Sequence, residues 1–251
     1  MRIDLNCDMG ESFGAYTIGS DEAVLASVTS INVACGFHAG DPSVMRRTIR
    51  LARAAGVAVG AHPGFPDLVG FGRRELNASE DEVEDMVLYQ VAAIAGVARA
   101  EGVELRHVKA HGALYNMAVK DRRLADAIAR AVKAFDPSLR FFAPARSILF
   151  EAGAACGLRT VAEAFADRAY EDDGTLTSRK VAGAILHDPA TVVARIRRLV
   201  QEGRIRTRTG ADLELPVATI CTHGDTAGAA ELTRQLRAGL EAAGVSVRAP
   251  D

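Results

Sequence analysis

Six polar stretches of this chain each follow a short apolar segment of strand length, and four of its six histidines lie in them. The stretches are residues 4–11, 32–41, 61–64, 109–112, 163–168 and 221–225. Polar groups at the ends of so many strands predict one site built from all of them. A β/α barrel produces this arrangement, because its active site lies at the C-terminal ends of its strands. An open doubly wound sheet would instead concentrate such groups at one switch point.

The apolar segments alternate with longer helical patterns, which predicts an α/β fold with a mostly parallel sheet. The expected strands are residues 3–7, 30–34, 57–60, 106–110, 139–143, 160–164 and 218–221. The expected helices are residues 21–27, 42–55, 79–101, 121–135, 189–202 and 226–243. Residues 204–216 instead indicate a β-hairpin with Thr209-Gly210 at its turn. We expect a single β/α-barrel catalytic domain over residues 1–251, because this is about one barrel's length and we find no repeat or linker.

Composition narrows the class of function. A formal net charge of −2 implies neither a nucleic-acid partner nor an acidic membrane surface, and no apolar run is long enough to span a bilayer. The chain has no tryptophan and only 5% aromatic residues, which argues against an aromatic sugar groove or a base-stacking platform. The four cysteines lack paired spacing and the N-terminus lacks a signal-peptide pattern, so we expect a reduced, cytoplasmic location.

The first expected strand carries three alternating polar residues, Asp4, Asn6 and Asp8, which share one face. On a barrel strand that face is the interior, where a carboxylate is costly unless it is paired or hydrogen-bonded. This favours a functional role for Asp8. Asp4 is either functional or a structural anchor low in the barrel, and Glu11 lies just beyond on the loop.

Lys109 and His111 also share a face, at the end of the fourth expected strand. A partly desolvated ammonium there could bind a carboxylate, stabilise an oxyanion or act as a base. His38 lies in a glycine-flanked turn that allows close approach to a ligand. His62 ends the third strand, and its alternative role is that of a hydrogen-bonded core imidazole. Deeper in the fourth strand, His107 is expected to be structural.

Two further groups of charged residues follow strands. Glu163 is an inward-facing carboxylate candidate, and Arg168 could neutralise an acid or pair with its neighbour Asp167. Arg73 and Arg74 either clamp a substrate carboxylate or form a solvated basic turn.

A divalent metal is one hypothesis for the strand-end residues. The ligand candidates are Asp8, His38, His62, His111 and His223. Such ligands could hold an ion that activates water, but their spacing matches no local metal motif. A metal-free site with a carboxylate base and Lys and His stabilisers is equally workable. Cys7, Cys35 and Cys221 approach the same strand ends and are expected to pack as small apolar residues.

Taken together, the motifs resemble those of the LamB/YcsF family. The matching segments are DLNCDMGESFG (residues 4–14), NVACGFHAGDP (32–42), AHPGFPDLVGFGRR (61–74), HVKAHGALYN (107–116), EAFADR (163–168) with DG (173–174), and CTHGD (221–225). Each is weak alone, but together they span nearly the whole chain in order. Ala110 departs from the family pattern, which more often has proline there. That change alters backbone stiffness beside Lys109 and removes no functional group.

The resemblance implies a seven-stranded barrel related to the polysaccharide deacetylase type. It also implies that the chain acts in the bacterial 5-oxoprolinase beside subunits B and C, opening the lactam of 5-oxoproline to L-glutamate with ATP. No phosphate-binding loop or dinucleotide fingerprint is present, so ATP is expected to bind mainly on the partner subunits.

For that reaction we expect Asp8 or Glu163 to activate water, Lys109 and a histidine to stabilise the oxyanion, and Arg73 or Arg74 to hold the substrate carboxylate. The expected catalytic residues are Asp8, His62, Lys109, His111 and Glu163. The expected substrate-binding residues are Asn6, Asn32, His38, Arg73, Arg74, Arg168 and His223. Two alternatives stay open: a stand-alone metal-dependent deacetylase or amidohydrolase, with Asp8, His38 and His62 as ligands, and a non-catalytic subunit that binds partners.

Overall fold

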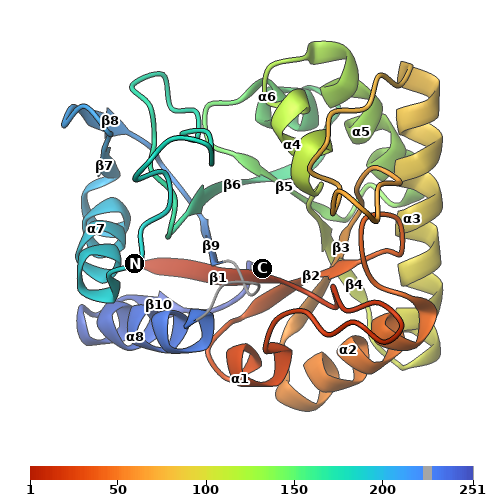
Figure 1. Ribbon diagram of the computed structural model, residues 1–251, viewed down its shortest axis with the longest axis horizontal. Helices are drawn as coiled ribbons and strands as arrows, with labels where there is room; N and C mark the ends of the chain where they lie inside the picture. The colour runs from red at the N-terminus through yellow and green to blue at the C-terminus, as the bar shows by residue number, and fades with distance from the viewer. Residues whose placement is uncertain (223–227, 251) are drawn as a thin grey trace.

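Seven parallel strands close into a barrel in the computed structural model, which describes residues 1–222 and 228–250. In spatial order the strands are β1 (Arg2–Met9), β2 (Ser30–Ala34), β3 (Ala58–His62), β4 (Leu105–Val108), β5 (Arg140–Pro144), β6 (Arg159–Phe165) and β9 (Thr219–Thr222). Strand β9 pairs with both β6 and β1, and this double pairing closes the sheet. The predicted seven-stranded β/α barrel is therefore confirmed (Figure 1).

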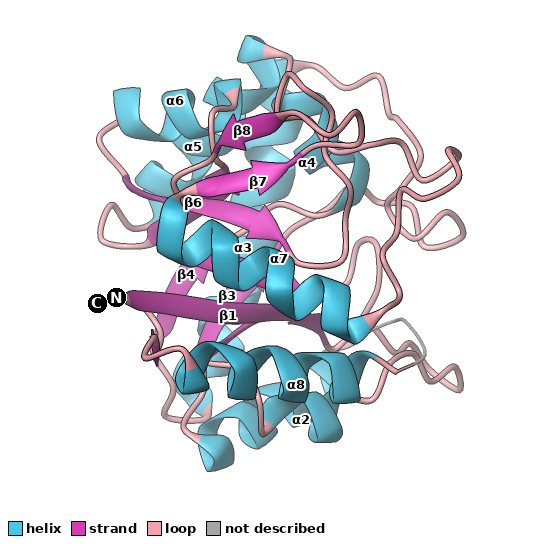
Figure 2. Cartoon of the chain, turned by 90° about the vertical axis from the view of Figure 1, so that its left-hand side faces the viewer, coloured by secondary structure: helices cyan, strands magenta, loops and turns pink. Residues whose placement is uncertain are grey.

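Helices surround the barrel and cover its outer face (Figures 1 and 2). They are α1 (Asp21–Leu25), α2 (Pro42–Ala55), α3 (Glu80–Ala100), α4 (Gly112–Ala118), α5 (Arg122–Phe135), α6 (Ile148–Ala155), α7 (Pro189–Glu202) and α8 (Ala229–Ala242). The two that we did not predict, α4 and α6, have only 7 and 8 residues, too few for a helical period to be recognised. Within the described ranges, no helix has the length and apolar character needed to cross a membrane.

Local signals placed the long helices correctly. The side chain of Asp41 accepts hydrogen bonds from the amides of Ser43 and Val44 and caps α2. A reciprocal capping box between Ser79 and Glu82 starts α3. The predicted hairpin is also present, as antiparallel β7 (Arg204–Arg206) and β8 (Asp212–Glu214) packed beside α7. A short strand that we did not predict, β10 (Ser246–Val247), pairs with the start of β1.

Strand boundaries differ from the predicted ones in ways that matter for the site. Strands β1 and β3 run two residues further than expected at their C-terminal ends, so Asp8 and His62 lie within them. Strand β4 ends at Val108, but the Lys109 amide still donates to the carbonyl of Ala61 at 3.0 Å. The His111 amide likewise donates to Pro63, at 2.8 Å. These two bonds extend the β3–β4 pairing and fix the backbone that carries Lys109 and His111.

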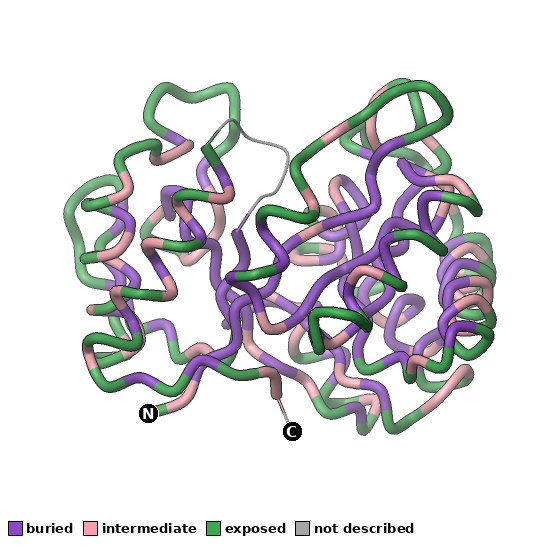
Figure 3. The backbone as a smooth tube through the Cα atoms, turned by 90° about the horizontal axis from the view of Figure 1, so that it is seen from below, coloured by how far each residue is buried: buried purple, intermediate pink, exposed green. Residues whose placement is uncertain are grey.

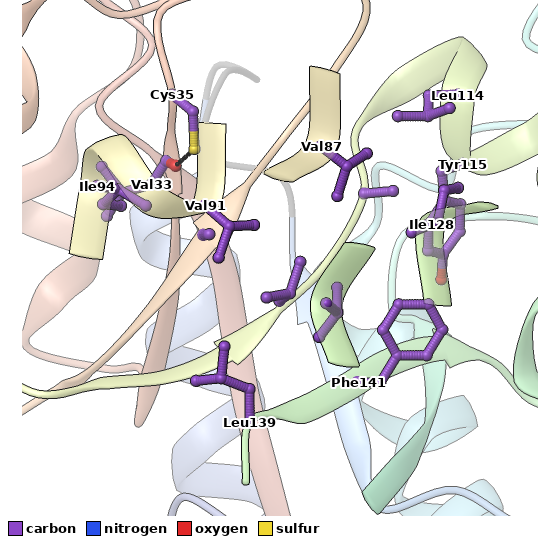
Figure 4. Close-up of a cluster of buried hydrophobic side chains, with 14 of the residues drawn as sticks. Val33, Cys35, Val87, Val91, Ile94, Leu114, Tyr115, Ile128, Leu139 and Phe141 are labelled. Atoms are coloured by element: carbon purple, nitrogen blue, oxygen red, sulfur yellow. Dashed lines mark hydrogen bonds between the residues drawn. The ribbon is translucent and has the colours of Figure 1, made fainter. Parts of the chain in front are cut away.

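Apolar side chains fill the layer between the barrel and its helices. Figure 4 shows Val33 of β2 and Phe141 of β5 with Val87, Val91 and Ile94 of α3, all buried. Burying each such side chain contributes about 1.5–3 kcal/mol. Figure 3 shows how burial is distributed, with buried strands at the centre and exposed residues on the outer turns of the helices.

The three cysteines near the strand ends are buried thiols. Burial raises the pKa of Cys35 to about 12, and its Sγ donates to the carbonyl of Val33 (Figure 4). The pKa values of Cys7 and Cys221 are raised well above the ordinary thiol value, also mainly by burial. None of the three has the low pKa of a reactive thiolate, in agreement with the expected packing role.

The barrel interior is polar, unlike the branched apolar layers that usually fill such barrels. At its lower level, the Asp4 carboxylate accepts hydrogen bonds from the hydroxyls of Thr29, Ser30 and Thr219. Burial raises the pKa of Asp4, against the effect of these hydroxyls. Asp4 is therefore a structural anchor, and it binds hydroxyl groups of neighbouring strands and loops.

Candidate active site

A buried lysine lies at the centre of the barrel's C-terminal end. Lys109 Nζ is 3.1 Å from Asp8 Oδ1 and 3.0 Å from Glu163 Oε1, and its side chain is only 2% exposed. Burial lowers the pKa of Lys109, but the nearby charges of Asp8 and Glu163 and the Cys221 sulfur together raise it well above its ordinary value. Lys109 is therefore held as an ammonium ion. A role as a base, which the sequence left open, does not fit this environment.

Lys109 also contacts Asn6 Oδ1 at 3.2 Å and Cys221 Sγ at 3.0 Å. An ammonium has three hydrogens to donate, and four acceptors surround this one. The expected role of direct oxyanion stabilisation is thus not supported by the geometry. The arrangement instead suits an ion that orients two carboxylates and balances their charge.

The two carboxylates differ in their access to the barrel mouth. Both oxygens of Glu163 have donors, since Oε1 accepts from Asn6 at 2.9 Å and Oε2 accepts from Tyr115 at 2.6 Å. The Glu163 side chain is 0% exposed, whereas that of Asp8 is 11% exposed. Asp8 Oδ1 accepts from Asn32 and Lys109, and Asp8 Oδ2 lies 3.3 Å from His62 Nε2. Asp8 is consequently the carboxylate placed to meet a substrate or water.

Two asparagines connect these groups into one network. Asn32 Nδ2 donates to Asn6 Oδ1 at 2.7 Å and to Asp8 Oδ1 at 2.8 Å. Asn32 Oδ1 accepts from His107 Nε2 at 2.8 Å, and the His107 ring stacks on Phe142. His107 is structural, as expected, and Gly60 makes room for it because a Cβ there would lie 2.2 Å from His107 Nε2. Both asparagines thus hold the carboxylates in place and are fully buried, so neither is placed at the mouth to bind substrate.

Three imidazoles form a second cluster beside Asp8. His38 stacks on His111 with ring centroids 3.7 Å apart, and His62 meets both rings edge-on. His111 Nδ1 lies 3.0 Å from His62 Nε2. Burial lowers the pKa of His111 to about 3 and that of His38 well below its ordinary value, with further lowering from the neighbouring imidazoles. His38 and His111 are therefore neutral at physiological pH.

Glu11 completes this cluster. Its Oε1 lies 3.7 Å from His38 Nε2 and 3.9 Å from His111 Nδ1, and its side chain is 6% exposed. Among the described residues, one ligand atom each from Glu11, His38, His62 and His111 falls within 4.8 Å of the others. Asp8, expected as a metal ligand together with His38 and His62, is not part of this group, although it borders it.

The loop after β3 covers the imidazoles. Phe71 O accepts from His111 Nε2 at 2.8 Å, and the Phe71 ring meets His38 and His111 edge-on. A Cβ at Gly72 would lie 2.7 Å from His38 Cβ, and one at Gly64 would lie 2.7 Å from His38 Nδ1. Glycine at both positions therefore lets the loop close over the histidines.

The candidate arginines separate into two groups. Arg74 is exposed and forms an ion pair with Asp67. The Arg73 guanidinium lies over the Phe71 ring, 4.8 Å from its centroid, at the edge of the imidazole cluster. Arg168 is buried and donates through Nη2 to Thr177 O, while its Nε has no hydrogen-bond partner among the described residues. Its pKa is lowered by burial and then by nearby positive charge, including Arg179 and Arg73.

The structure thus brings together most of the residues expected at the site. Around Lys109 and the imidazoles it gathers Asn6, Asp8, Asn32, His38, His62, His111 and Glu163. Arg73 lies at its margin over Phe71, Arg74 lies outside it, and Arg168 lies beyond the end of β6, where the charge of Arg73 acts on it. The last expected residue, His223, is outside the described part of the chain.

Sequence reasoning missed two contributors. Glu11 was noted only as a loop residue, although it stands three residues after Asp8 in the same motif. Tyr115 was not considered, because α4, which carries it, was not predicted. Its hydroxyl donates to Glu163, and burial raises its pKa well above the ordinary tyrosine value.

Comparison with known proteins places this site in a family. The model of the LamB/YcsF family matches residues 3–251. The chain belongs to the LamB/YcsF family. It is 57% identical to the A subunit of 5-oxoprolinase from Symbiobacterium thermophilum, over 99% of this chain and 95% of that relative. The resemblance seen in the sequence motifs is therefore confirmed.

Solved structures agree with this LamB/YcsF assignment. A lactam utilization protein from Thermus thermophilus is 48% identical, with a TM-score of 0.95 and complete coverage of both chains. A family 4 carbohydrate esterase from Streptomyces lividans has a TM-score of 0.50 at 13% identity, covering 98% of this chain and 91% of the esterase. The second likeness shows a shared fold alone, in line with the deacetylase-type barrel that the family resemblance implied.

Proposed function

We propose that this chain is the A subunit of an ATP-dependent 5-oxoprolinase, which hydrolyses the lactam of 5-oxo-L-proline to L-glutamate. The observation that carries the proposal is the full-length likeness to proteins that bear this name, at 57% identity for one of them. The buried acid–lysine–imidazole site supports it, because it offers a positioned carboxylate and neutral imidazoles to a small polar amide.

In this reaction Asp8 takes a proton from water as the water oxygen attacks the carbonyl carbon of the ATP-activated lactam. The ring C–N bond then breaks, and the nitrogen leaves as the α-amine of the glutamyl product after gaining the proton that Asp8 took from water. Lys109 and Asn32 orient Asp8 through Oδ1, which leaves Oδ2 facing His62 and the mouth. Glu163 keeps Lys109 charged and in place. This division assigns the base, which the sequence left open between Asp8 and Glu163, to Asp8.

ATP serves to activate the lactam, since an unstrained amide is a poor electrophile. Transfer of the γ-phosphoryl group to the carbonyl oxygen would give ADP and a phosphorylated imidate, whose carbon is a far better electrophile. Attack by one water with loss of the ring nitrogen then gives γ-glutamyl phosphate, and a second water hydrolyses this acyl phosphate to glutamate and phosphate. We expect ATP to bind mainly on subunits B and C, because this chain lacks the usual phosphate-binding loops. The four free thiols suit a reducing, cytoplasmic setting.

The direct test is glutamate release from 5-oxoproline by this chain alone and mixed with candidate subunits B and C, each with and without ATP. We expect release only from the complete mixture with ATP. A folded mixture that releases no glutamate under any condition would refute the proposed substrate.

The substrate carboxylate is expected to bind Arg168, whose buried Nε has no hydrogen-bond partner among the described residues. Arg168→Gln should raise KM for 5-oxoproline by about 10- to 100-fold with a much smaller change in kcat, because a lost charged hydrogen bond costs about 1.5–3 kcal/mol. The readout is steady-state kinetics of the assembled enzyme.

Arg74→Gln is the matched control, since Arg74 is exposed and forms an ion pair with Asp67. Its kinetics should stay within about twofold of those of the unaltered enzyme. A raised KM in Arg74→Gln with none in Arg168→Gln would reverse the assignment.

A second candidate function, a stand-alone metal-dependent deacetylase or amidohydrolase, is favoured by the cluster of Glu11, His38, His62 and His111. Turnover of a small amide without ATP and without partner subunits would support it.

A further inference from the structure

We propose that the imidazole cluster binds one divalent transition-metal ion, with Zn²⁺ as the best match. The ligands are His62 Nε2, His111 Nδ1, a carboxylate oxygen of Glu11, and a ring nitrogen of His38. This donor set of nitrogen and carboxylate oxygen is typical of zinc in proteins. The chain's own hydrogen bonds support the assignment independently of any reaction.

The first argument concerns which imidazole nitrogens carry hydrogen. His62 Nδ1 lies 2.7 Å from the carbonyl oxygen of Lys109, and His111 Nε2 lies 2.8 Å from that of Phe71. A carbonyl only accepts, so both of these nitrogens must be donors. In the neutral rings the other nitrogens, His62 Nε2 and His111 Nδ1, then carry lone pairs. The two nitrogens lie 3.0 Å apart, so their lone pairs repel each other unless a cation lies between them.

A proton could relieve that repulsion, but the surrounding groups are arranged for a larger cation. Glu11 Oε1 lies 3.9 Å from His111 Nδ1 and 3.7 Å from His38 Nε2. A zinc ion with bonds of about 2.0–2.1 Å has ligand atoms about 3.3 Å apart. Three of the observed separations, 3.0, 3.7 and 3.9 Å, bracket that value, and all four ligand atoms lie within 4.8 Å of one another, so the site is completed when the groups draw together and the His38 ring turns.

His38 gives the second, independent observation. Its side chain is fully buried, yet neither Nδ1 nor Nε2 has a hydrogen-bond partner in the part of the chain that the structure describes. A buried imidazole without a hydrogen bond is costly, which calls for a ligand. Because His38 and His111 are stacked in parallel planes, one ion cannot lie in both planes at once. His38, which no hydrogen bond holds, is the ring that must turn to coordinate.

The hydrogen bonds from His62 and His111 to backbone carbonyl oxygens are also typical of metal-binding histidines. A ligating imidazole almost always donates its other N–H to a carbonyl or carboxylate, which fixes its tautomer and orientation. His62 and His111 both do so here, to Lys109 O and Phe71 O. The covering loop with Gly64 and Gly72 shields the cluster, and Asp8 Oδ2 borders it at 3.3 Å from His62. A bound ion would therefore lie beside the proposed base.

The test uses the isolated full-length chain, so that its outcome is separate from that of the 5-oxoprolinase assay. After metal is removed with a chelator, Zn²⁺ binding is titrated by calorimetry, and the Co²⁺-loaded chain is examined by visible absorption. We expect one equivalent of Zn²⁺ per chain and the intense absorption bands of four-coordinate Co²⁺. X-ray absorption of the zinc-loaded, unaltered chain should show a first shell of nitrogen and oxygen without sulfur.

Variants then locate the ion. His62→Gln and Glu11→Gln should each weaken Zn²⁺ binding about 100-fold or more, since even supporting residues of metal sites contribute 10- to 100-fold. His187→Gln is the matched control, because His187 is exposed and far along the chain from the cluster, and its affinity should be unchanged. Circular dichroism checks that each variant is folded.

Three results would overturn the proposal. The unaltered chain could bind no stoichiometric metal, which would leave a shared proton between His62 and His111. Binding could survive unchanged in folded His62→Gln and Glu11→Gln, which would place the ion elsewhere. X-ray absorption could show sulfur ligation, which would point to the cysteines. The X-ray absorption result requires no variant to fold.

Discussion

Lys109→Met should destabilise the chain by about 3–5 kcal/mol, because it removes the cation between two carboxylates and leaves them buried without a counter-charge. Lys109 Nζ lies 3.1 Å from Asp8 and 3.0 Å from Glu163, and the lysine side chain is 2% exposed. Methionine keeps a similar length without the charge, so the effect reports electrostatics rather than a cavity. Urea unfolding followed by circular dichroism measures the change in the free energy of unfolding.

Two further variants make this test specific. Lys133→Met makes the same replacement at an exposed helical position and should change stability by less than about 0.5 kcal/mol. Combining Lys109→Met with Glu163→Gln removes one of the unpaired charges and should recover part of the loss. If Lys109→Met alone is as stable as the unaltered chain, the three groups do not form the ion cluster described here.

Asp8→Asn should lower kcat of the assembled enzyme by about 10²- to 10⁴-fold, the usual contribution of a general base. The amide oxygen can still accept the hydrogen bonds from Asn32 and Lys109, so the fold should survive. The loss of the base should also remove the acid limb of the pH–rate profile, which a purely structural change would leave in place. Stopped assays of glutamate release across pH provide both readouts.

The comparison that separates the two carboxylates is Glu163→Gln. Glu163 is 0% exposed and already bonded to Asn6, Tyr115 and Lys109, so its variant should keep the acid limb and lose less activity than Asp8→Asn. The opposite order would make Glu163 the base. Full activity in folded Asp8→Asn would rule out Asp8 as the base, and with it the proposed mechanism.

Most of the fold could be predicted from the chain because its signals are local. Alternation of short apolar segments and helical patterns identified all seven barrel strands, and the caps at Asp41 and Ser79 marked two helix starts. The short helices α4 and α6 escaped because 7 or 8 residues hold barely two turns. Because α4 was not predicted, Tyr115 was also overlooked, although its hydroxyl donates a hydrogen bond to Glu163.

The site was predictable in its location and less so in its roles. Polar groups at successive strand ends must meet at one end of a closed barrel, whatever the details of packing. Which of these groups pair depends on the register between strands and on the conformation of the loops. Neither can be read from neighbouring residues in the sequence. Arg73 and Arg74 are adjacent in sequence, yet one lies over Phe71 beside the imidazoles and the other forms an exposed ion pair with Asp67.

The sequence by itself therefore determined the barrel, its strand-end site and the family, because periodicity, caps and motifs are properties of neighbouring residues. Only the tertiary structure decided that Lys109 is an ammonium ion shared by Asp8, 101 positions away, and Glu163. It also decided that Glu11 joins the three imidazoles. The physical reason is that charge state and ligation depend on distances of a few ångströms and on burial, which arise only when the barrel closes.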